Sequence, residues 1–141
     1  ANTYIVGKAD KKIEELVENT KKSLYVGLDS IKDGAKISDI GKAIELFAKE
    51  KNLGVVRELV GHRVGTSVHE DPDVPNYYTP DRTVLKSGMV LAVEPMLTLG
   101  ERYIYMLDDD WTIKTDDGLP SAHFEHTVLV TKEGYEILTG E

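Results

Sequence analysis

The sequence contains no cysteine, which excludes disulfide bonds and thiolate metal sites. Any bound metal ion must therefore be held by histidine, aspartate or glutamate. No apolar run approaches the roughly 18 residues that a membrane-spanning helix needs, and the first residues lack a signal-peptide pattern. We therefore expect a cytoplasmic protein with no membrane partner.

Positive charge is also scarce. The chain has 17 lysines and arginines against 25 aspartates and glutamates, a formal net charge of −8 at pH 7. Such a chain is repelled by a phosphate backbone at long range, so we expect no nucleic-acid partner. Hydrophobic residues make up 40% of the chain, which is typical of a globular protein and too many for a disordered one. The length of 141 residues predicts a single domain, residues 1–141.

Apolar residues recur at helical spacing in the first third of the chain. They predict one helix over residues 10–32 and a second over residues 38–54, each ended by glycine. The inward positions are Ile13, Leu16, Val17, Leu24, Leu28, Ile31, Ile40, Ala43, Ile44, Phe47 and Ala48. Before the helices, residues 2–7 have the pattern of the second half of a β-strand that ends at a glycine. We expect the two helices to be packing elements.

The period changes to that of β-strands after Gly54. The expected strands are residues 55–60, 90–93, 103–107, 111–115, 122–131 and 135–139. Their connections are short and turn-forming, which favours antiparallel neighbours. The stretch 70–83 contains three prolines and is expected to be a long irregular loop. Helices gathered ahead of an antiparallel sheet predict an α+β domain.

Two glutamates stand inside apolar strands. Glu94 follows four apolar residues, where a carboxylate would need a cation or strong hydrogen bonds. Glu125 lies on an expected strand whose period of two places His123, Glu125, Thr127 and Leu129 on one face. The alternative is a strand edge at which the Glu125 carboxylate lies in water.

Histidines supply a second kind of donor. His62 stands between two glycines, which allow the backbone to approach a site closely, and His69 follows seven residues later. Either histidine alone could be an ordinary loop residue. Together with Glu94 and Glu125 they offer imidazole and carboxylate and no softer donor, a mixture suited to Mn, Fe, Co or Zn. A metal site is therefore the better interpretation.

Several segments together carry a resemblance to a known family. They are residues 4–7, 60–65, 69–72, 85–89, 93–96, 111–112 and 121–127. In order and spacing they resemble the C-terminal half of a type I methionine aminopeptidase of the pita-bread fold, over essentially the whole chain. This resemblance implies two helices packed on a curved, antiparallel β-sheet. Prolidases and aminopeptidase P share the metal pattern, but the strand around Glu125 and its preceding Trp-Thr segment are more similar to the methionine enzymes.

The resemblance implies roles for four residues. His62, Glu94 and Glu125 match three of the five side chains that bind two divalent metal ions (Co, Mn, Fe or Zn) in the family, and Glu125 matches the ligand that bridges both ions. His69 matches the histidine that contacts the scissile amide and helps to stabilise the tetrahedral intermediate. The catalytic residues implied are therefore His69 and Glu125.

The resemblance also implies a substrate pocket and a missing part. Trp111 matches an aromatic residue near the pocket for the methionine side chain, and Val68 occupies a position in that region where a larger aromatic is common. Arg63 stands where the family often has glycine. The other two metal ligands are aspartates upstream of residues 4–7, and this chain has neither. We therefore expect a complementary N-terminal half or a second chain as a partner, and no activity without it.

The function implied is that of a metal-dependent aminopeptidase that removes the N-terminal methionine from a peptide or nascent chain. Two alternatives stay open. The first is a proline dipeptidase or an enzyme like aminopeptidase P, which an assay with Met-peptides against Xaa-Pro dipeptides would separate. The second is a non-catalytic pita-bread module that binds peptides, although such a module would not need His62, His69, Glu94 and Glu125.

Overall fold

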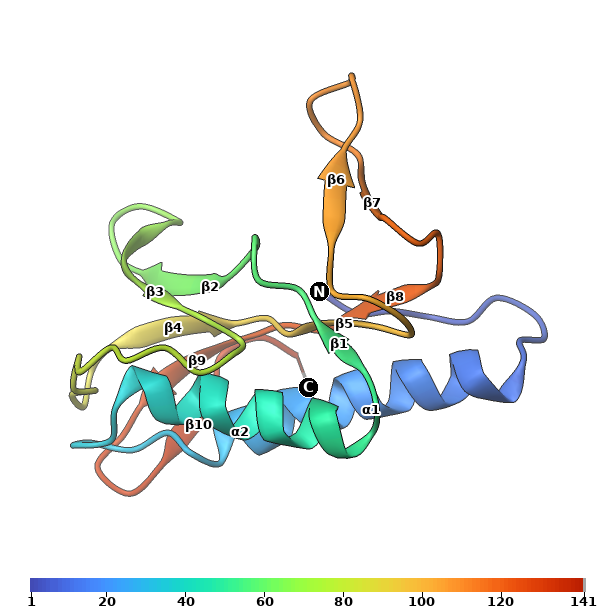
Figure 1. Ribbon diagram of the computed structural model, residues 1–141. Coiled ribbons are helices and arrows are strands. Elements are labelled where there is room, and N and C mark those ends of the chain that lie inside the picture. The colour runs from blue at the N-terminus through green and yellow to red at the C-terminus, as the bar shows by residue number, and fades with distance from the viewer. Residues whose placement is uncertain (141) are drawn as a thin grey trace.

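The computed structural model describes residues 1–140, which form two helices and ten strands in an α+β arrangement (Figure 1). The helices are α1 (Lys11–Leu28) and α2 (Ile37–Glu50). The strands are β1 (Gly54–Val55), β2 (Gly61–Val64), β3 (Glu70–Val74), β4 (Val90–Val93), β5 (Met96–Thr98), β6 (Ile104–Met106), β7 (Ile113–Thr115), β8 (Ser121–His123), β9 (His126–Val130) and β10 (Tyr135–Ile137). The predicted fold class is confirmed.

The described strands form three antiparallel sheets. A five-stranded sheet has the order β10-β9-β4-β2-β3, a three-stranded sheet has the order β1-β5-β8, and β6 and β7 form a hairpin. The two larger sheets are continuous along the chain, because β4 leads into β5 and β8 leads into β9. The predicted curved sheet is thus divided into two sheets. We call the place where β4 passes into β5 and β8 passes into β9 the junction, and this junction positions the candidate site.

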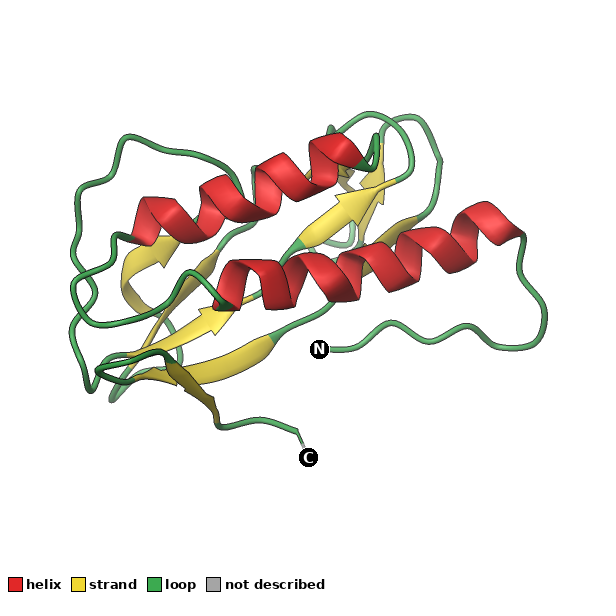
Figure 2. Cartoon of the chain, turned by 90° about the horizontal axis from the view of Figure 1, so that it is seen from below, coloured by secondary structure: helices red, strands yellow, loops and turns green. Residues whose placement is uncertain are grey.

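The helices lie side by side on one face of the sheets (Figure 2). The β6–β7 hairpin projects from the other side of the molecule (Figure 1). Gly27 of α1 allows the helices to approach, because a Cβ there would meet the side chain of Ile44 in α2. Neither helix of the described chain is long and apolar enough to cross a membrane.

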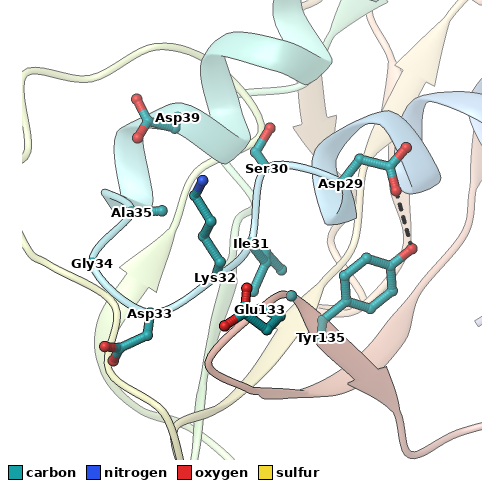
Figure 3. A pocket seen from close by; sticks show the side chains of 11 residues that line it. Asp29, Ser30, Ile31, Lys32, Asp33, Gly34, Ala35, Asp39, Glu133 and Tyr135 are labelled. Atoms are coloured by element: carbon teal, nitrogen blue, oxygen red, sulfur yellow. Dashed lines mark hydrogen bonds between the residues drawn. The ribbon is translucent and has the colours of Figure 1, made fainter.

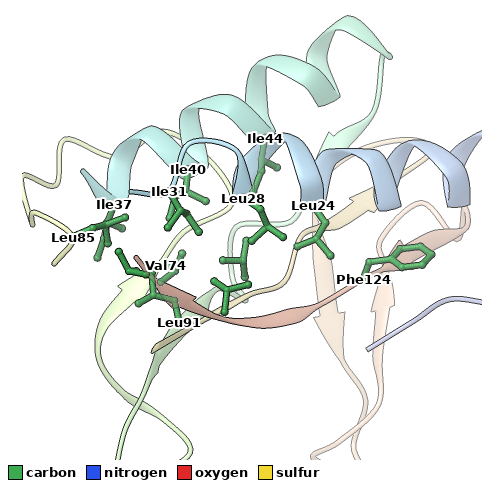
Figure 4. Packing of buried hydrophobic residues seen from close by; sticks show 13 residues of the cluster. Leu24, Leu28, Ile31, Ile37, Ile40, Ile44, Val74, Leu85, Leu91 and Phe124 are labelled. Atoms are coloured by element: carbon green, nitrogen blue, oxygen red, sulfur yellow. The ribbon is translucent and has the colours of Figure 1, made fainter. Parts of the chain in front are cut away.

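The main core lies between the helices and the five-stranded sheet (Figure 4). Its buried members are Leu24, Leu28, Ile31, Ile37, Ile40, Ile44, Val74, Leu85, Leu91, Val93, Phe124, Val128 and Val130. Burying one such side chain stabilises the fold by about 1.5–3 kcal/mol. Leu91 and Val93 of β4 belong to this core, so the period of two directs Ala92 and the following Glu94 to the opposite face of the sheet.

Both predicted helices are present, but they end earlier than expected. The carbonyl of Asp10 accepts hydrogen bonds from the first turn of α1, as a residue at the helix start should. The helix stops at Leu28 because the next residues are drawn into a loop, in which the amide of Gly34 donates to the carbonyl of Leu85. After α2 the left-handed residue is Asn52, with φ of 55°, whereas Gly54 already begins β1.

Several strand predictions are wrong in their bounds. Residues 2–7 form no strand, and of residues 55–60 only Val55 is in one. The loop predicted over residues 70–83 begins with β3, which contains Pro72. A proline is tolerated there because β3 lies at the edge of its sheet. The segment that brackets His62 is itself the strand β2, and β5 was not predicted. The strand predicted over residues 122–131 is divided into β8 and β9.

Candidate metal centre

The two glutamates of the expected metal site lie at the junction of the two larger sheets. Glu94 stands between β4 and β5, and Glu125 stands between β8 and β9. The pairing of β4 with β9 places Val93 opposite His126, and the pairing of β5 with β8 continues the same register. Glu94 and Glu125 therefore face each other across the junction.

Like charges that face each other across two strands are destabilising. The side chains of Glu94 and Glu125 are only 14% and 30% exposed, so water screens them incompletely. A divalent cation between the two carboxylates would remove the repulsion. This opposed pair is the main structural reason to regard the junction as a metal centre.

Two imidazoles flank the carboxylate of Glu94. Nε2 of His62 lies 3.6 Å from Oε1, and Nε2 of His123 lies 3.5 Å from Oε2. Potential ligand atoms of Glu94, His123 and Glu125 all lie within 4.8 Å of one another. The structure thus brings together the three predicted metal ligands and adds His123.

His62 reaches the cluster through the pairing of β2 with β4. The register places His62 opposite Ala92, which shares a face of the sheet with Glu94. Gly61 makes this close pairing possible, because a Cβ there would overlap the carbonyl oxygen of Ala92. Nδ1 of His62 donates to the carbonyl of Arg63 over 3.0 Å, which leaves the Nε2 lone pair available to a metal ion.

His69 lies beside His62 and away from the carboxylates. The centroids of the two rings are 4.0 Å apart, and their planes are inclined by 46°. The His69 side chain is exposed at the end of the β2–β3 loop. A pocket of about 420 Å³ opens at this place, lined by Val60, His62, His69, Glu70, Asp71 and Asp73. His69 can therefore contact a molecule that approaches His62 from solvent.

Glu70 closes the loop that carries His69. Its Oε1 accepts hydrogen bonds from the amide of Ser67 and from the hydroxyl of Thr66, each 3.0 Å long. These two bonds, that of Ser67 first, hold the pKa of the Glu70 carboxyl below its usual value. The ionised carboxylate thus stabilises the loop that positions His69.

The two residues predicted to line the methionine pocket are far more exposed. The side chain of Trp111 is 85% exposed near the end of the β6–β7 hairpin, and that of Val68 is 69% exposed on the β2–β3 loop. Their substrate-binding roles stay predictions.

Residues 1–3 run along the segment that carries His123 and Glu125. The hydroxyl of Thr3 donates to the carbonyl of His123 over 2.8 Å and accepts from its amide over 2.9 Å. The amide of Glu125 donates to the carbonyl of Ala1 over 2.9 Å. The backbone nitrogen of Ala1 lies 3.1 Å from Oε2 of Glu125. The path of this segment therefore leads into the carboxylate cluster.

A larger pocket, of about 870 Å³, lies beyond the end of α1 (Figure 3). Its lining includes three aspartates, but each carboxylate already has a partner in the fold. Asp29 accepts from the hydroxyl of Tyr135 over 3.3 Å, Asp33 accepts from a backbone amide over 2.8 Å, and Asp39 accepts from another over 3.0 Å. These carboxylates stabilise loops, so we place the chemistry at the smaller cluster around Glu94.

The donor set at the junction fits a divalent transition metal. It consists of imidazole nitrogen and carboxylate oxygen, which suit Mn, Fe, Co or Zn. The one member that sequence reasoning gave no role is His123. A signal for it existed, because the period of two already placed His123 on the same strand face as Glu125.

Comparison with known proteins gives one consistent result. Residues 1–132 match the model of metallopeptidase family M24. The chain is 47% identical over 138 residues to methionine aminopeptidase 1 of Bacillus subtilis, covering 97% of this chain and 56% of the relative. It is 44% identical to a methionine aminopeptidase of Borreliella burgdorferi, covering 100% of this chain and 57% of the relative. The chain thus spans about half the length of the curated relatives that it matches.

Solved structures give the same result. A methionine aminopeptidase from Thermotoga maritima is similar with a TM-score of 0.96 and 43% identity, covering 99% of this chain and 57% of that chain. The prolidase from Pyrococcus furiosus is similar with a TM-score of 0.73 and 26% identity, covering 99% of this chain and 36% of that chain. Both fold and sequence are therefore more similar to the methionine aminopeptidase than to the prolidase.

Proposed function

The chain belongs to metallopeptidase family M24, and from this membership we propose that it supplies half of the active site of a methionine aminopeptidase. Such an enzyme removes the N-terminal methionine from a peptide or nascent chain, and we assign residues 1–141 to the C-terminal half of its catalytic domain. The supporting observation is the opposed pair Glu94 and Glu125 beside His62, within a fold similar to that of a methionine aminopeptidase. A nascent-chain substrate also favours the cytoplasm as its location.

Three side chains of this half would hold two divalent metal ions. His62 and Glu94 lie on one side of the junction, and Glu125 faces Glu94 from the other side, so the three side chains would hold the ions between them. When bound, the ions lower the pKa of a water molecule and polarise the scissile carbonyl. The carboxylate of Glu125 is partly buried and can accept the proton that the attacking water gives up.

His69 would act on the substrate. Its ring contacts that of His62, with the centroids 4.0 Å apart, and faces the pocket at the β2–β3 loop. From there an N–H of the imidazole can donate a hydrogen bond to the scissile amide as negative charge develops on its oxygen. The Glu70 carboxylate keeps the loop in this position.

A second, smaller pocket beside His123 fits the side chain of the first substrate residue. It has a volume of about 150 Å³, and its apolar lining residues are Val56, Met96, Ile104, Ile113 and Ala122. An unbranched apolar side chain such as that of methionine suits a narrow pocket of this kind. Trp111 is carried by the same hairpin as Ile104 and Ile113, but it does not line this pocket, so its place near the methionine side chain stays a prediction.

A complementary N-terminal half, or a second chain, would complete the site. The resemblance implies five metal ligands, whereas this chain offers three of them, and it spans about half the length of its relatives. Residues 1–3 lie along His123 and Glu125, so a segment that continues or docks at Ala1 enters the cluster directly. Such a segment could supply the two missing aspartates.

Hydrolysis assays with and without the complementary half test this function. The 141-residue chain alone should bind divalent metal weakly and should not cleave a Met-Ala-Ser peptide measurably, because three ligands hold two ions poorly. Adding the complementary half should restore both properties, with Met-peptides cleaved and Xaa-Pro dipeptides left intact. Preference for Xaa-Pro dipeptides would favour the prolidase alternative, and unaided cleavage would show that the site uses other ligands.

A further inference from the structure

We propose that His123 is an additional metal-binding residue, which supplies an imidazole nitrogen on the side of Glu94 opposite His62. This inference rests on the proposed metal site. It adds to that site a donor that the resemblance did not imply, since the three positions matched to the family's ligands are His62, Glu94 and Glu125.

The distances agree with two ligands of one ion better than with a hydrogen bond. Nε2 of His123 lies 3.5 Å from Oε2 of Glu94, whereas hydrogen bonds to oxygen are about 2.7–3.2 Å long. Two ligand atoms that each lie about 2.1 Å from a tetrahedral metal ion are about 3.4 Å apart. Nε2 of His62 lies at a similar distance, 3.6 Å, from Oε1 of Glu94. Glu94 thus has one imidazole nitrogen at each carboxylate oxygen.

The reactive nitrogen of His123 lacks a partner. Its Nε2 is buried and makes no hydrogen bond within residues 1–140, although 35% of the side chain is exposed. Buried polar atoms are nearly always hydrogen-bonded, so an unpaired ring nitrogen that points at two carboxylates needs an explanation. A bound cation would satisfy the nitrogen and both carboxylates together.

The fold holds His123 in this orientation. Its amide and its carbonyl both bond to the hydroxyl of Thr3, and its strand pairs with β5 directly opposite Met96. His126, three residues further along, has a different environment. Its ring lies on the helix side, with Nε2 3.3 Å from the hydroxyl of Tyr25 and Nδ1 3.2 Å from that of Thr139. The same chain segment thus offers a matched control histidine.

A second imidazole changes which metal the site prefers. Imidazole suits Zn and Fe, whereas carboxylate and carbonyl oxygen suit Mn. With His62 and His123 both bound, the site should favour Zn²⁺ over Mn²⁺ more strongly than a site with His62 alone. Replacing His123 by glutamine, which offers an amide oxygen, should reduce that preference.

The test uses the 141-residue chain and the variants His123→Gln and His126→Gln, with Zn²⁺ and Mn²⁺ titrated calorimetrically. His123→Gln should weaken Zn²⁺ binding about tenfold or more and Mn²⁺ binding less, and His126→Gln should leave both unchanged. Electron spin echo spectra of the Cu²⁺-loaded proteins count bound imidazoles directly. They should show two in the original chain and in His126→Gln, and one in His123→Gln.

A further variant separates a ligand from a residue that merely supports the fold. His123→Ala leaves space for free imidazole, so added imidazole should restore Zn²⁺ binding if the ring is a ligand. Failure of this rescue, or equal imidazole counts in the original chain and in His123→Gln, would overturn the role of His123 and leave the proposed function standing. Absence of metal binding by the original chain even after the complementary half is added would overturn both proposals.

Discussion

Asn76 fixes the backbone of Glu94. Its side chain is fully buried, and its Nδ2 donates to the carbonyl oxygen of Glu94 over 3.2 Å. The segment that carries Asn76 is itself set by α2, because a Cβ at Gly41 would overlap the carbonyl oxygens of Pro75 and Tyr77. The position of the candidate metal ligand therefore depends on the packing of a helix on the other side of the sheet.

Asn76→Ala should destabilise the protein and weaken metal binding together. The substitution leaves the Glu94 carbonyl without this donor, and an unsatisfied buried group costs about 1–3 kcal/mol. Urea denaturation measures the loss of stability, and calorimetric titration with Zn²⁺ measures the loss of affinity. A destabilised variant with normal metal affinity would show that Asn76 supports the fold and does not position Glu94.

Gly41→Ala should destabilise the protein, although alanine is favoured over glycine by about 1 kcal/mol within a helix. The added Cβ would have to displace a backbone segment, and overpacking of this kind typically costs about 1–3 kcal/mol. Gly27→Ala is the matched control on α1. There the Cβ would meet side-chain atoms of the buried Ile44 and no backbone atom, so the cost should be smaller. Urea denaturation measures the loss of folding stability in each variant. A larger loss of stability for Gly27→Ala than for Gly41→Ala would contradict this account.

Glu125→Ala should remove metal and activity together in the completed enzyme. In the proposed site this carboxylate would hold metal and would also accept the proton from water. Metal content is measured by mass spectrometry and turnover with a Met-peptide. Glu133 is exposed, so Glu133→Ala serves as the control and should keep the metal content and turnover of the original enzyme. Two bound metals and normal turnover in Glu125→Ala would make Glu125 a structural strand residue.

His69→Ala should lower turnover while leaving the metal content intact. Its ring contacts that of His62 and is not part of the cluster of Glu94, His123 and Glu125. Losing one donor to a developing negative charge typically lowers the rate about 10²- to 10³-fold. A kinetic assay with a Met-Ala-Ser peptide measures this change. An unchanged rate would remove His69 from the mechanism, and a loss of metal would make it a ligand.

The loop that carries His69 should loosen in acid. The pKa of Glu70 lies below its ordinary value of 4.5, mainly because the Ser67 amide and then the Thr66 hydroxyl bond to the ionised form. A lowered pKa means that the carboxylate stabilises the folded loop above pH 4.5 and that this effect is lost as the pH falls through the folded-state pKa. Amide exchange at Ser67 is followed by NMR from pH 6 to pH 3, and each rate is compared with the intrinsic rate of an unstructured peptide at the same pH. The resulting protection factor should fall at the acid end, and Glu70→Gln should show a low protection factor throughout this range.

The helices could be predicted from sequence because their pattern is local. Positions such as Leu24, Leu28 and Ile44 repeat at helical spacing and are buried as expected. The helix ends could not be placed, because tertiary hydrogen bonds decide them. The amide of Gly34 bonds to Leu85, a residue far along the chain, and this bond gives no local signal.

The candidate site was predictable in its residues and less so in its geometry. Glu94 and Glu125 were conspicuous as carboxylates inside apolar strands, and the structure places them face to face. The alternation of residues along the strand predicts which face His123 lies on. It does not predict that Glu94 is its neighbour across the sheet, because the register between distant strands is a tertiary property. For the same reason β3, which contains a proline, and β5, which is three residues long, escaped prediction, because their pairing defines them.

The unbroken register between the two sheets has an evolutionary consequence. A single inserted residue between β4 and β5 would turn Glu94 to the other face of the sheet, and only a matching insertion between β8 and β9 could restore its opposition to Glu125. The chain between β5 and β8 carries the projecting β6–β7 hairpin and is free of this constraint. Natural variants of this protein should therefore differ in length at the hairpin, while residues 90–98 and 121–130 keep a constant length.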